Sequence, residues 1–308
     1  MSLQRFKAVE GEAHVELLAD TLVKPGDLLE RDSFRVASYN LHNLFGKDNP
    51  KTKPASSEQL DALVEVITGL DADVLALQEV GDREPLVNIL KRVNRRLKGG
   101  TGYTVALTPS HDPRGINVAV ATRFSERGRF TFQDREFDGI DETIKFSRDL
   151  FGVQIAATPT YSFLLFVTHL KSKLARSEEE GRRATRKRGL EATEIRSILE
   201  DKQLGYIKQP LLLAGDMNDD PGTNPIQTLC GQGSKALKDV LAAASPDDYT
   251  YPTHKKRKKR GSTRLDYILA SRSIKVTDYA IHRDHPQAAV ASDHYPVSVT
   301  VKVPRPRS

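Results

Sequence analysis

Short apolar runs that end abruptly in polar residues recur along this chain. The clearest is residues 211–214, a continuous apolar run typical of a buried strand, which stops at Gly215-Asp216-Met217-Asn218. Because residues two apart in an extended chain face the same side, Asp216 and Asn218 should point together at the edge of a sheet. Four other strand-like runs are bordered by polar residues in the same manner, at Asn40, Glu79, His169 and Asp293-His294. These borders together predict one site.

The spacing of apolar residues between these borders predicts alternating strands and helices. Residues 34–40 and 74–77 have strand patterns, and a helix that opens with a capping box at Ser56 separates them. Residues 163–167 form another strand, and a long helix should follow from Ser177. The strand, helix, strand order occurs in both halves, which indicates an α/β protein with two layered half-domains.

The remaining segments are expected to be rich in strands. Strands are predicted at residues 103–107, 117–122, 150–156, 265–269, 276–282 and 297–303. Residues 125–149 are charged and predict a loop, whereas residues 226–229 and 237–244 predict helices.

These patterns predict one domain at residues 34–303, an N-terminal extension at 1–33 and a solvated tail at 304–308. The chain is 38% hydrophobic and 29% charged, which is typical of a soluble globular protein. No apolar run approaches the ~20 residues of a membrane helix, so no membrane span is expected. The first residues lack an apolar signal core. The compartment is therefore unknown, with the cytoplasm as the default expectation.

Cysteine content and charge narrow the chemistry. Cys230 is the only cysteine, which excludes an intrachain disulfide and a thiolate-rich zinc site. The formal net charge is +6 and the sequence pI is about 9.2. This basic balance is a mild argument for a polyanionic partner such as nucleic acid.

The side chains at the strand borders are mainly oxygen donors. They are Asn40, Glu79, Asp216, Asn218, Asp266 and Asp293. Such ligands suit a hard cation, so Mg²⁺ is the expected cofactor, with Mn²⁺ as a possible substitute. His169 and His294 lie among them as candidate acids, bases or transition-state donors. A metal, carboxylates and histidines favour in-line attack of water on phosphorus.

Six motifs in order resemble the endonuclease/exonuclease/phosphatase superfamily, which has the deoxyribonuclease-I-like fold. The motifs begin at Tyr39-Asn40, Leu77-Gln78-Glu79, Thr168-His169, Gly215-Asp216-Met217-Asn218, Leu265-Asp266-Tyr267 and Ser292-Asp293-His294. The resemblance runs from about Phe34 to about Val303. It implies a four-layer α/β/β/α sandwich of two facing mixed β-sheets, with the site where their loops meet.

The resemblance also implies roles. Glu79 would be the principal metal ligand, with Asn40 and Asp293 nearby. Asp216 and Asn218 would orient or deprotonate the attacking water and hold the phosphate. 

Two histidines complete the implied machinery. Asp266 would hydrogen-bond His294, and His169 would stabilise the transition state or help to protonate the leaving group. The sequence leaves open whether Asp216 or His294 takes the proton from water.

The sequence lacks features of two branches of this family, which narrows the expected substrates. Residues 261–266 lack the Trp-x-Cys-Asp-Arg-type motif of the phosphoinositide phosphatases, and the chain has no tryptophan. The chain also lacks a visible aromatic-rich hairpin for membrane insertion, which lowers a sphingomyelinase interpretation.

Substrate contacts are less sharply indicated. Lys171 could touch a phosphate or lie in a solvated loop. Arg148 and Asn117 could also reach a phosphate, although a surface salt bridge or a strand-end hydrogen bond fits them better. A run of six cations that begins Lys255-Lys256-Arg257 should emerge near the site and attract a nucleic-acid backbone, although such runs are usually solvated loops. The other histidines are assigned no catalytic role, and they are His14, His42, His111, His254, His282 and His285.

The leading hypothesis is a Mg²⁺-dependent phosphodiesterase that acts as a nuclease on DNA or RNA. The alternative is a phosphatase or phosphodiesterase of a small phosphorylated metabolite or lipid head group. A more remote alternative is an inactive nucleic-acid-binding module on the same fold. A monomer is expected, and the sequence indicates no protein partner.

Overall fold

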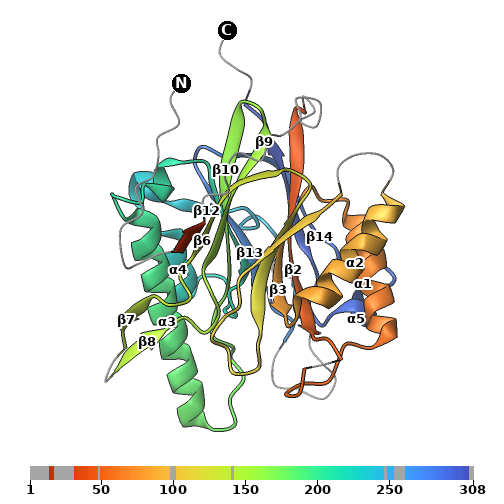
Figure 1. Ribbon diagram of the computed structural model, residues 1–308. Helices are drawn as coiled ribbons and strands as arrows, with labels where there is room; N and C mark the ends of the chain where they lie inside the picture. Colours follow the sequence, from red (N-terminus) through yellow and green to blue (C-terminus); the bar gives the residue numbers. More distant parts are fainter. Residues whose placement is uncertain are drawn as a thin grey trace.

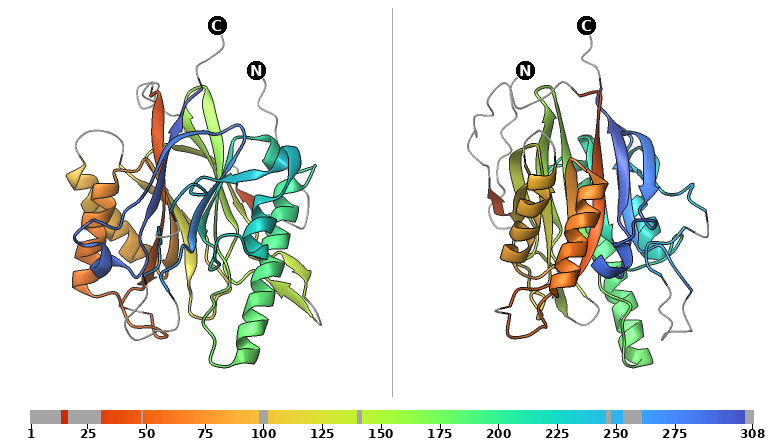
Figure 2. Two further views of the ribbon diagram at one scale, coloured as in Figure 1. Left: turned by 180° about the vertical axis from the view of Figure 1, so that it is seen from behind. Right: turned by 90° about the vertical axis from the view of Figure 1, so that its right-hand side faces the viewer.

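Two large β-sheets lie face to face, and helices cover the outer face of each (Figure 1). The computed structural model describes residues 14–16, 31–47, 49–97, 102–139, 142–245, 248–252 and 261–304. Seen from the side, the helices on one face, the sheets and the opposite helices form successive layers (Figure 2). The predicted α/β/β/α sandwich with two facing mixed sheets is confirmed.

The first sheet has the strand order β1-β6-β9-β10-β11-β13-β12. Its strands are β1 His14–Glu16, β6 Ser125–Thr131, β9 Phe151–Thr158, β10 Tyr161–His169, β11 Leu211–Asp216, β12 Leu237–Asp239 and β13 Asp266–Ser271. β10 and β11 pair in parallel, whereas the other neighbours are antiparallel.

The second sheet has the order β14-β15-β2-β3-β5-β4. Its strands are β2 Ser33–Leu44, β3 Val74–Val80, β4 Thr104–Leu107, β5 Asn117–Thr122, β14 Lys275–Ile281 and β15 Val297–Lys302. β2 and β3 are its parallel pair. A small hairpin of β7 Glu136–Asp138 and β8 Thr143–Lys145 stands apart from both sheets.

Each parallel pair is joined by a helix that packs on the outer face of its own sheet. The helices over the second sheet are α1 Ser57–Leu70, α2 Arg83–Arg96 and α5 Ala288–Ala291. Those over the first are α3 Glu178–Glu200 and α4 Asn224–Cys230, and the short 3₁₀ turns are Tyr206–Lys208 and Gly233–Lys235. The two halves therefore repeat the strand, helix, strand unit that the sequence predicts. Among the described residues, no helix combines the length and the apolar character that crossing a bilayer requires.

Both predicted helix starts are confirmed. The Ser56 hydroxyl accepts the backbone N–H of Gln59 at 3.1 Å, and the Ser177 hydroxyl accepts that of Glu180 at 3.2 Å. The side chain of Gln59 does not close the box, because it donates to the carbonyl of His42 at 2.9 Å. It therefore ties α1 to the end of β2, close to the polar border of that strand.

Two predictions of secondary structure are wrong. The charged segment 125–149 holds β6 and the β7–β8 hairpin, because β6 is half exposed and its polar side chains tolerate the solvent face. The helix expected at residues 237–244 is instead strand β12 followed by turns. β12 pairs with β13 at the sheet edge, so ladder hydrogen bonds replace a helix that would have been short. Within residues 1–33, β1 pairs with β6 at the opposite edge.

The core between the sheets is mainly apolar and takes one fixed face of each strand that contributes to it. It takes Val36 of β2, Leu165 of β10, Leu212 of β11 and Ile268 of β13, which are all at most 1% exposed. Since side chains alternate along a strand, residues an even number of positions further along continue this same face. Polar residues at the strand ends that continue this face therefore also point between the two sheets.

The buried acid Asp149 makes stability depend on pH. Its carboxylate accepts the Thr131 hydroxyl at 2.6 Å and the backbone N–H of Phe132 at 2.8 Å. Burial outweighs these bonds and raises the pKa of Asp149 from 3.8 to about 6. The folded state therefore binds the proton more tightly, and this stabilisation is present below pH 3.8 and lost as the pH rises through 6.

We predict that Asp149→Asn removes this pH dependence. From well below pH 3.8 to well above pH 6, wild type should lose about 3 kcal/mol of unfolding free energy relative to the variant. Urea unfolding of both proteins across this range measures the difference. Parallel pH curves for the two proteins would contradict the prediction.

Candidate active site

Three polar residues form a row across the end of the first sheet. In the strand register His169 lies opposite Asp216, and Asp216 lies opposite Asp266. Each continues the face that carries the core between the sheets, so all three side chains point toward the second sheet. They are at most 2% exposed. The polar ends of these strands therefore meet as the sequence predicts.

The second sheet contributes Asn40 and Glu79 at the ends of its parallel pair. Asn40 continues the inward face of β2 after Val36, so it faces the first sheet directly. Glu79 follows the face of β3 that points away from the first sheet. The pairing register of β3 shifts at this point, and the backbone of Glu79 has φ 56°. The left-handed turn re-aims its carboxylate into the cleft.

Left-handed backbone is concentrated at this site. The described non-glycine residues with positive φ are His42, Asn43, Asp71, Glu79 and Asn218, and all of them except Asp71 line the cleft. Each such residue costs about 1–3 kcal/mol relative to an ordinary conformation. The surrounding sheets hold this strain, which is the usual signature of a functional site.

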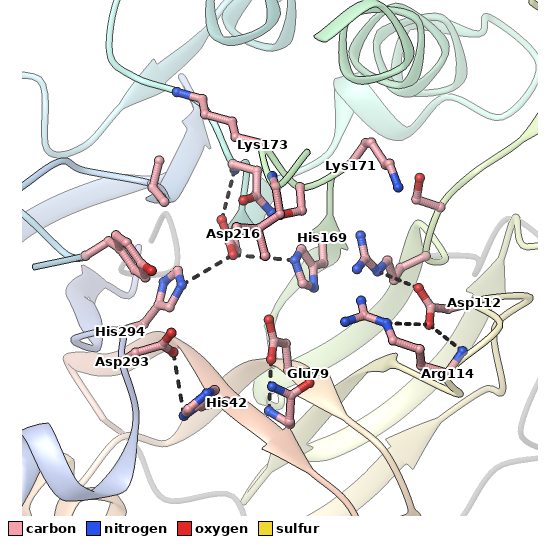
Figure 3. Close-up of a pocket in the computed structure, with 18 of the residues that line it drawn as sticks. His42, Glu79, Asp112, Arg114, His169, Lys171, Lys173, Asp216, Asp293 and His294 are labelled. Atoms are coloured by element: carbon pink, nitrogen blue, oxygen red, sulfur yellow. Dashed lines mark hydrogen bonds and ion pairs between the residues drawn. The ribbon is translucent and has the colours of Figure 1, made fainter. Parts of the chain in front are cut away.

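The carboxylate of Asp216 is the centre of the hydrogen-bond network. It accepts the side-chain amide of Asn40 at 3.1 Å and the backbone N–H of Asn218 at 2.9 Å. The Nε2 atoms of His169 and His294 lie 3.5 and 3.7 Å from it, on opposite sides in Figure 3. Burial raises the pKa of Asp216.

The two histidines are held in opposite protonation states. Burial lowers the pKa of His294, but Asp266 and Asp216 outweigh it, so the pKa is raised and the imidazole is protonated at neutral pH. Asp266 accepts the Nδ1–H of His294 at 2.8 Å, which fixes the ring. For His169, burial and then the positive charge of Arg148 lower the pKa well below its ordinary value. His169 is therefore neutral.

A hard cation fits the carboxylates on the second-sheet side. Glu79 accepts only neutral donors, the Asn40 amide at 3.2 Å and the Asn43 N–H at 2.9 Å, so its negative charge has no cationic partner among the described side chains. Asp293 lines the same cleft, with His42 at 3.8 Å. Glu79 and Asp293 are thus the residues suited to hold Mg²⁺.

The side chain of Asn40, which is predicted to lie near the metal, contacts the carboxylates of both sheets. Its nitrogen faces Glu79 and Asp216, and its oxygen accepts the N–H of His42 at 3.0 Å. It therefore joins the two carboxylates. Another candidate set of ligand atoms, within 4.8 Å of one another, belongs to Asp216, Asp266 and His294. The protonated His294 offsets one of the two carboxylate charges of that set and offers no lone pair to a cation, which leaves Glu79 and Asp293 as the better cation ligands.

The network lies on the wall of a cleft of about 1650 Å³. Lys171 and Arg148 line it, together with His42, for which no catalytic role was predicted. Asn117 is not a lining residue. Its side chain donates to the carbonyl of Gly81 at 2.8 Å and accepts the N–H of Ser110 at 2.7 Å, so it holds loops instead of substrate. The predicted contacts Lys255, Lys256 and Arg257 lie outside the described residues.

Helix α3 supports the cleft with two buried charges that sequence reasoning missed. Arg188 donates to Asp219 at 2.8 Å and to the carbonyl of Lys171 at 3.0 Å. Glu191 accepts the N–H groups of Ser147 at 2.7 Å and of Lys171 at 2.8 Å. A signal was present, because both residues occur at helical spacing within the buried stripe of α3.

Comparison with known proteins agrees with this geometry. The model of the Endonuclease/Exonuclease/phosphatase family matches residues 37–294. No curated protein sequence matches the chain.

Among solved structures, an endonuclease/exonuclease/phosphatase from Bacteroides vulgatus has a TM-score of 0.63 at 17% identity, covering 89% of this chain and all of its own. A family protein from Leptotrichia buccalis scores 0.60 at 19% identity, covering 88% of this chain and 100% of its own. ANGEL2, described as a 2′,3′-cyclic phosphatase in complex with adenosine-2′,3′-vanadate, scores 0.58 at 17% identity over 88% of this chain and 96% of its own.

The site requires a glycine immediately before Asp216. A Cβ atom on Gly215 would lie 1.9 Å from the carbonyl oxygen of Thr168 on the neighbouring strand, and the φ of Gly215 is 149°. We predict that Gly215→Ala lowers the unfolding free energy by at least about 3 kcal/mol, because the parallel strands must separate.

The matched control is Gly189→Ala in α3, where an added Cβ meets no atom within 4 Å. That change should stabilise the protein by up to about 1 kcal/mol. Urea unfolding of both variants measures the contrast, and equal midpoints for Gly215→Ala and wild type would refute the prediction.

Proposed function

Because this chain belongs to the endonuclease/exonuclease/phosphatase family, whose members are phosphoric ester hydrolases, we propose that it is a Mg²⁺-dependent phosphodiesterase that acts on nucleic acid. The observation that carries the proposal is the buried Asp216 carboxylate between a protonated and a neutral histidine, opposite the carboxylates of Glu79 and Asp293. Acids, histidines and a cation site are the parts that attack of water on phosphorus requires.

The arrangement supports a division of roles. Asp216 takes the proton from the attacking water, because the Nδ1 and Nε2 atoms of His294 are both directed to carboxylates. The imidazolium ring of His294, which Asp266 holds in place, adds positive charge beside the phosphoryl oxygens. His169 offers a neutral ring on the other side, and Asn218 orients the phosphate. A bound Mg²⁺ would neutralise charge that develops on the phosphoryl oxygens.

The size and charge of the cleft favour nucleic acid over a small metabolite. Pockets for small ligands occupy roughly 300–1,000 Å³, and this cleft of about 1650 Å³ is larger. Cationic side chains line it, namely Arg114, Arg148, Lys171, Lys173 and Lys187. An extended polyanion fits such a surface, because phosphate contacts dominate nucleic-acid affinity. The adenosine-2′,3′-vanadate of ANGEL2 is a nucleotide-like ligand on the same fold.

We predict metal-dependent cleavage that requires Glu79. Supercoiled plasmid, single-stranded DNA, RNA and a simple phosphodiester would each be incubated with Mg²⁺ or with a chelator. Nucleic acids should be cleaved only with the metal, and Glu79→Gln should reduce the rate on the order of 100-fold or more. Cleavage of the simple ester alone would favour the small-metabolite alternative. Metal-dependent binding without cleavage would favour an inactive module.

We also predict that Asp266→Asn impairs the action of His294 without weakening substrate binding. The amide can still contact His294, but it cannot stabilise the imidazolium, so kcat should fall about 100- to 10,000-fold while KM changes little. The control is Asp278→Asn, which changes an exposed carboxylate on β14 and should leave the rate unaltered. Steady-state kinetics test the pair, with circular dichroism to verify folding. A KM effect without a kcat effect would contradict the assigned role.

A further inference from the structure

One side of the cleft carries more positive charge than the proposed chemistry uses. Lys171, Lys187 and Arg148 line this side. In Figure 3 Lys171, Asp112 and Arg114 lie on one side of His169, and His294 and Asp293 lie on the other. The cations thus adjoin the reacting centre on its neutral-histidine side.

The acids in this corner are already engaged. Asp112 forms ion pairs with Arg148 at 3.3 Å and with Arg114 at 3.5 Å. Both carboxylate oxygens of Glu191 accept hydrogen bonds from backbone N–H groups. Over the described ranges, neither a salt bridge nor a hydrogen bond holds the ammonium group of Lys171 or Lys187. Backbone contacts bring the three cations near one another, since Arg188, the residue after Lys187, donates to the carbonyl of Lys171 at 3.0 Å and Arg148 donates to the carbonyl of Leu170 at 3.4 Å. Burial, then Arg148 and Lys187, lower the pKa of Lys171.

Arg148 retains donor capacity although it is buried and paired with Asp112. Its side chain is only 4% exposed, and its Nε atom lies 3.3 Å from the Asp112 carboxylate without forming a hydrogen bond within the described structure. One of its terminal nitrogens donates weakly to the carbonyl of Leu170 at 3.4 Å. A buried guanidinium with unsatisfied donors is costly, and a phosphate presents the oxygens that would complete it.

The main chain at Lys171 is fixed in advance of binding. Glu191 accepts its N–H at 2.8 Å, and Arg188 donates to its carbonyl at 3.0 Å. Both partners are buried side chains of α3, and Arg188 is itself anchored by Asp219 at 2.8 Å. A preorganised backbone reduces the entropy lost when the side chain binds a ligand.

We propose that Lys171, Lys187 and Arg148 form a second phosphate subsite, which binds the phosphate next to the one that is hydrolysed. The inference rests on the proposed function and names its substrate class, a chain of linked phosphodiesters in preference to a single isolated one. The subsite adjoins His169, since Arg148 donates to the carbonyl of Leu170, the residue that follows His169. It aligns the chain so that the scissile phosphate lies between His169 and His294.

The test compares two substrates that differ in the number of phosphates. Bis(p-nitrophenyl) phosphate has one, and a single-stranded oligodeoxynucleotide has many. Lys187→Gln and Lys171→Gln should each lower kcat/KM for the oligonucleotide roughly 10-fold. The same variants should alter kcat/KM for the single ester by less than about 2-fold, because that ester does not reach the subsite.

The control is Lys145→Gln. Lys145 lines the same cleft, but it is neutralised by Asp134 at 3.8 Å and Glu136 at 3.6 Å, so its loss should leave both substrates unaffected. Fluorescence anisotropy gives a second measurement on the intact protein in chelator. The slope of log binding constant against log salt should decrease by about 0.7–1 in each subsite variant.

The outcomes separate the subsite from the proposed function. An equal loss on both substrates, or an unchanged salt slope, would overturn the subsite while leaving the hydrolase assignment intact. If wild type hydrolyses neither substrate, the proposed function fails, and the salt slope still decides the subsite. Absence of oligonucleotide binding by wild type would overturn the subsite as well.

Discussion

The buried carboxylate of Asp216 is the constraint on which the rest of the site depends. At 1% exposure, a carboxylate loses most of its hydration and requires donors at fixed positions. Those donors come from three directions, Asn40 of the second sheet, the N–H of Asn218 in the loop after β11, and His294 ahead of β15. The facing sheets must therefore converge at this edge, and any change in their spacing would leave a buried charge without a partner.

The alternation of side chains along the strands brings these polar groups together without any change in strand direction. Leu212 and Ala214 pack between the sheets, and Asp216 is the next side chain on the same face of β11. The side chains on this face change from apolar to polar at the end of the strand, while the face itself keeps pointing toward the second sheet. Glu79 is the exception, because it stands on the opposite face and needs a left-handed backbone to enter the cleft. The rigid apolar core holds that strained turn in place.

This regularity explains what the sequence could reveal. Residue type and strand order were enough to predict an α/β protein with two layered half-domains and a site that includes His169, Asp216 and Asp266, because a period of two fixes direction. The four-layer sandwich itself was predicted from the resemblance to the family. The amide orientation of Asn40 could not be predicted, since it depends on which neighbours donate to it. Arg188 and Glu191 were missed because helix charges are usually solvated, and only their spacing within the apolar stripe marks them as buried.

The distribution of charge across the cleft links the proposed cation to the proposed substrate. Acids gather on the side of His294, where Asp266, Asp293 and Glu79 would repel a phosphodiester on their own. Cations gather on the side of His169 and would attract the same anion. An anionic chain drawn in by the basic side can place one phosphate beside Asp216 only if positive charge offsets the acids there. His294 supplies one such charge, and a divalent cation on Glu79 and Asp293 would supply the remainder. The proposed metal requirement and the proposed preference for a polyanion would thus follow from one electrostatic asymmetry.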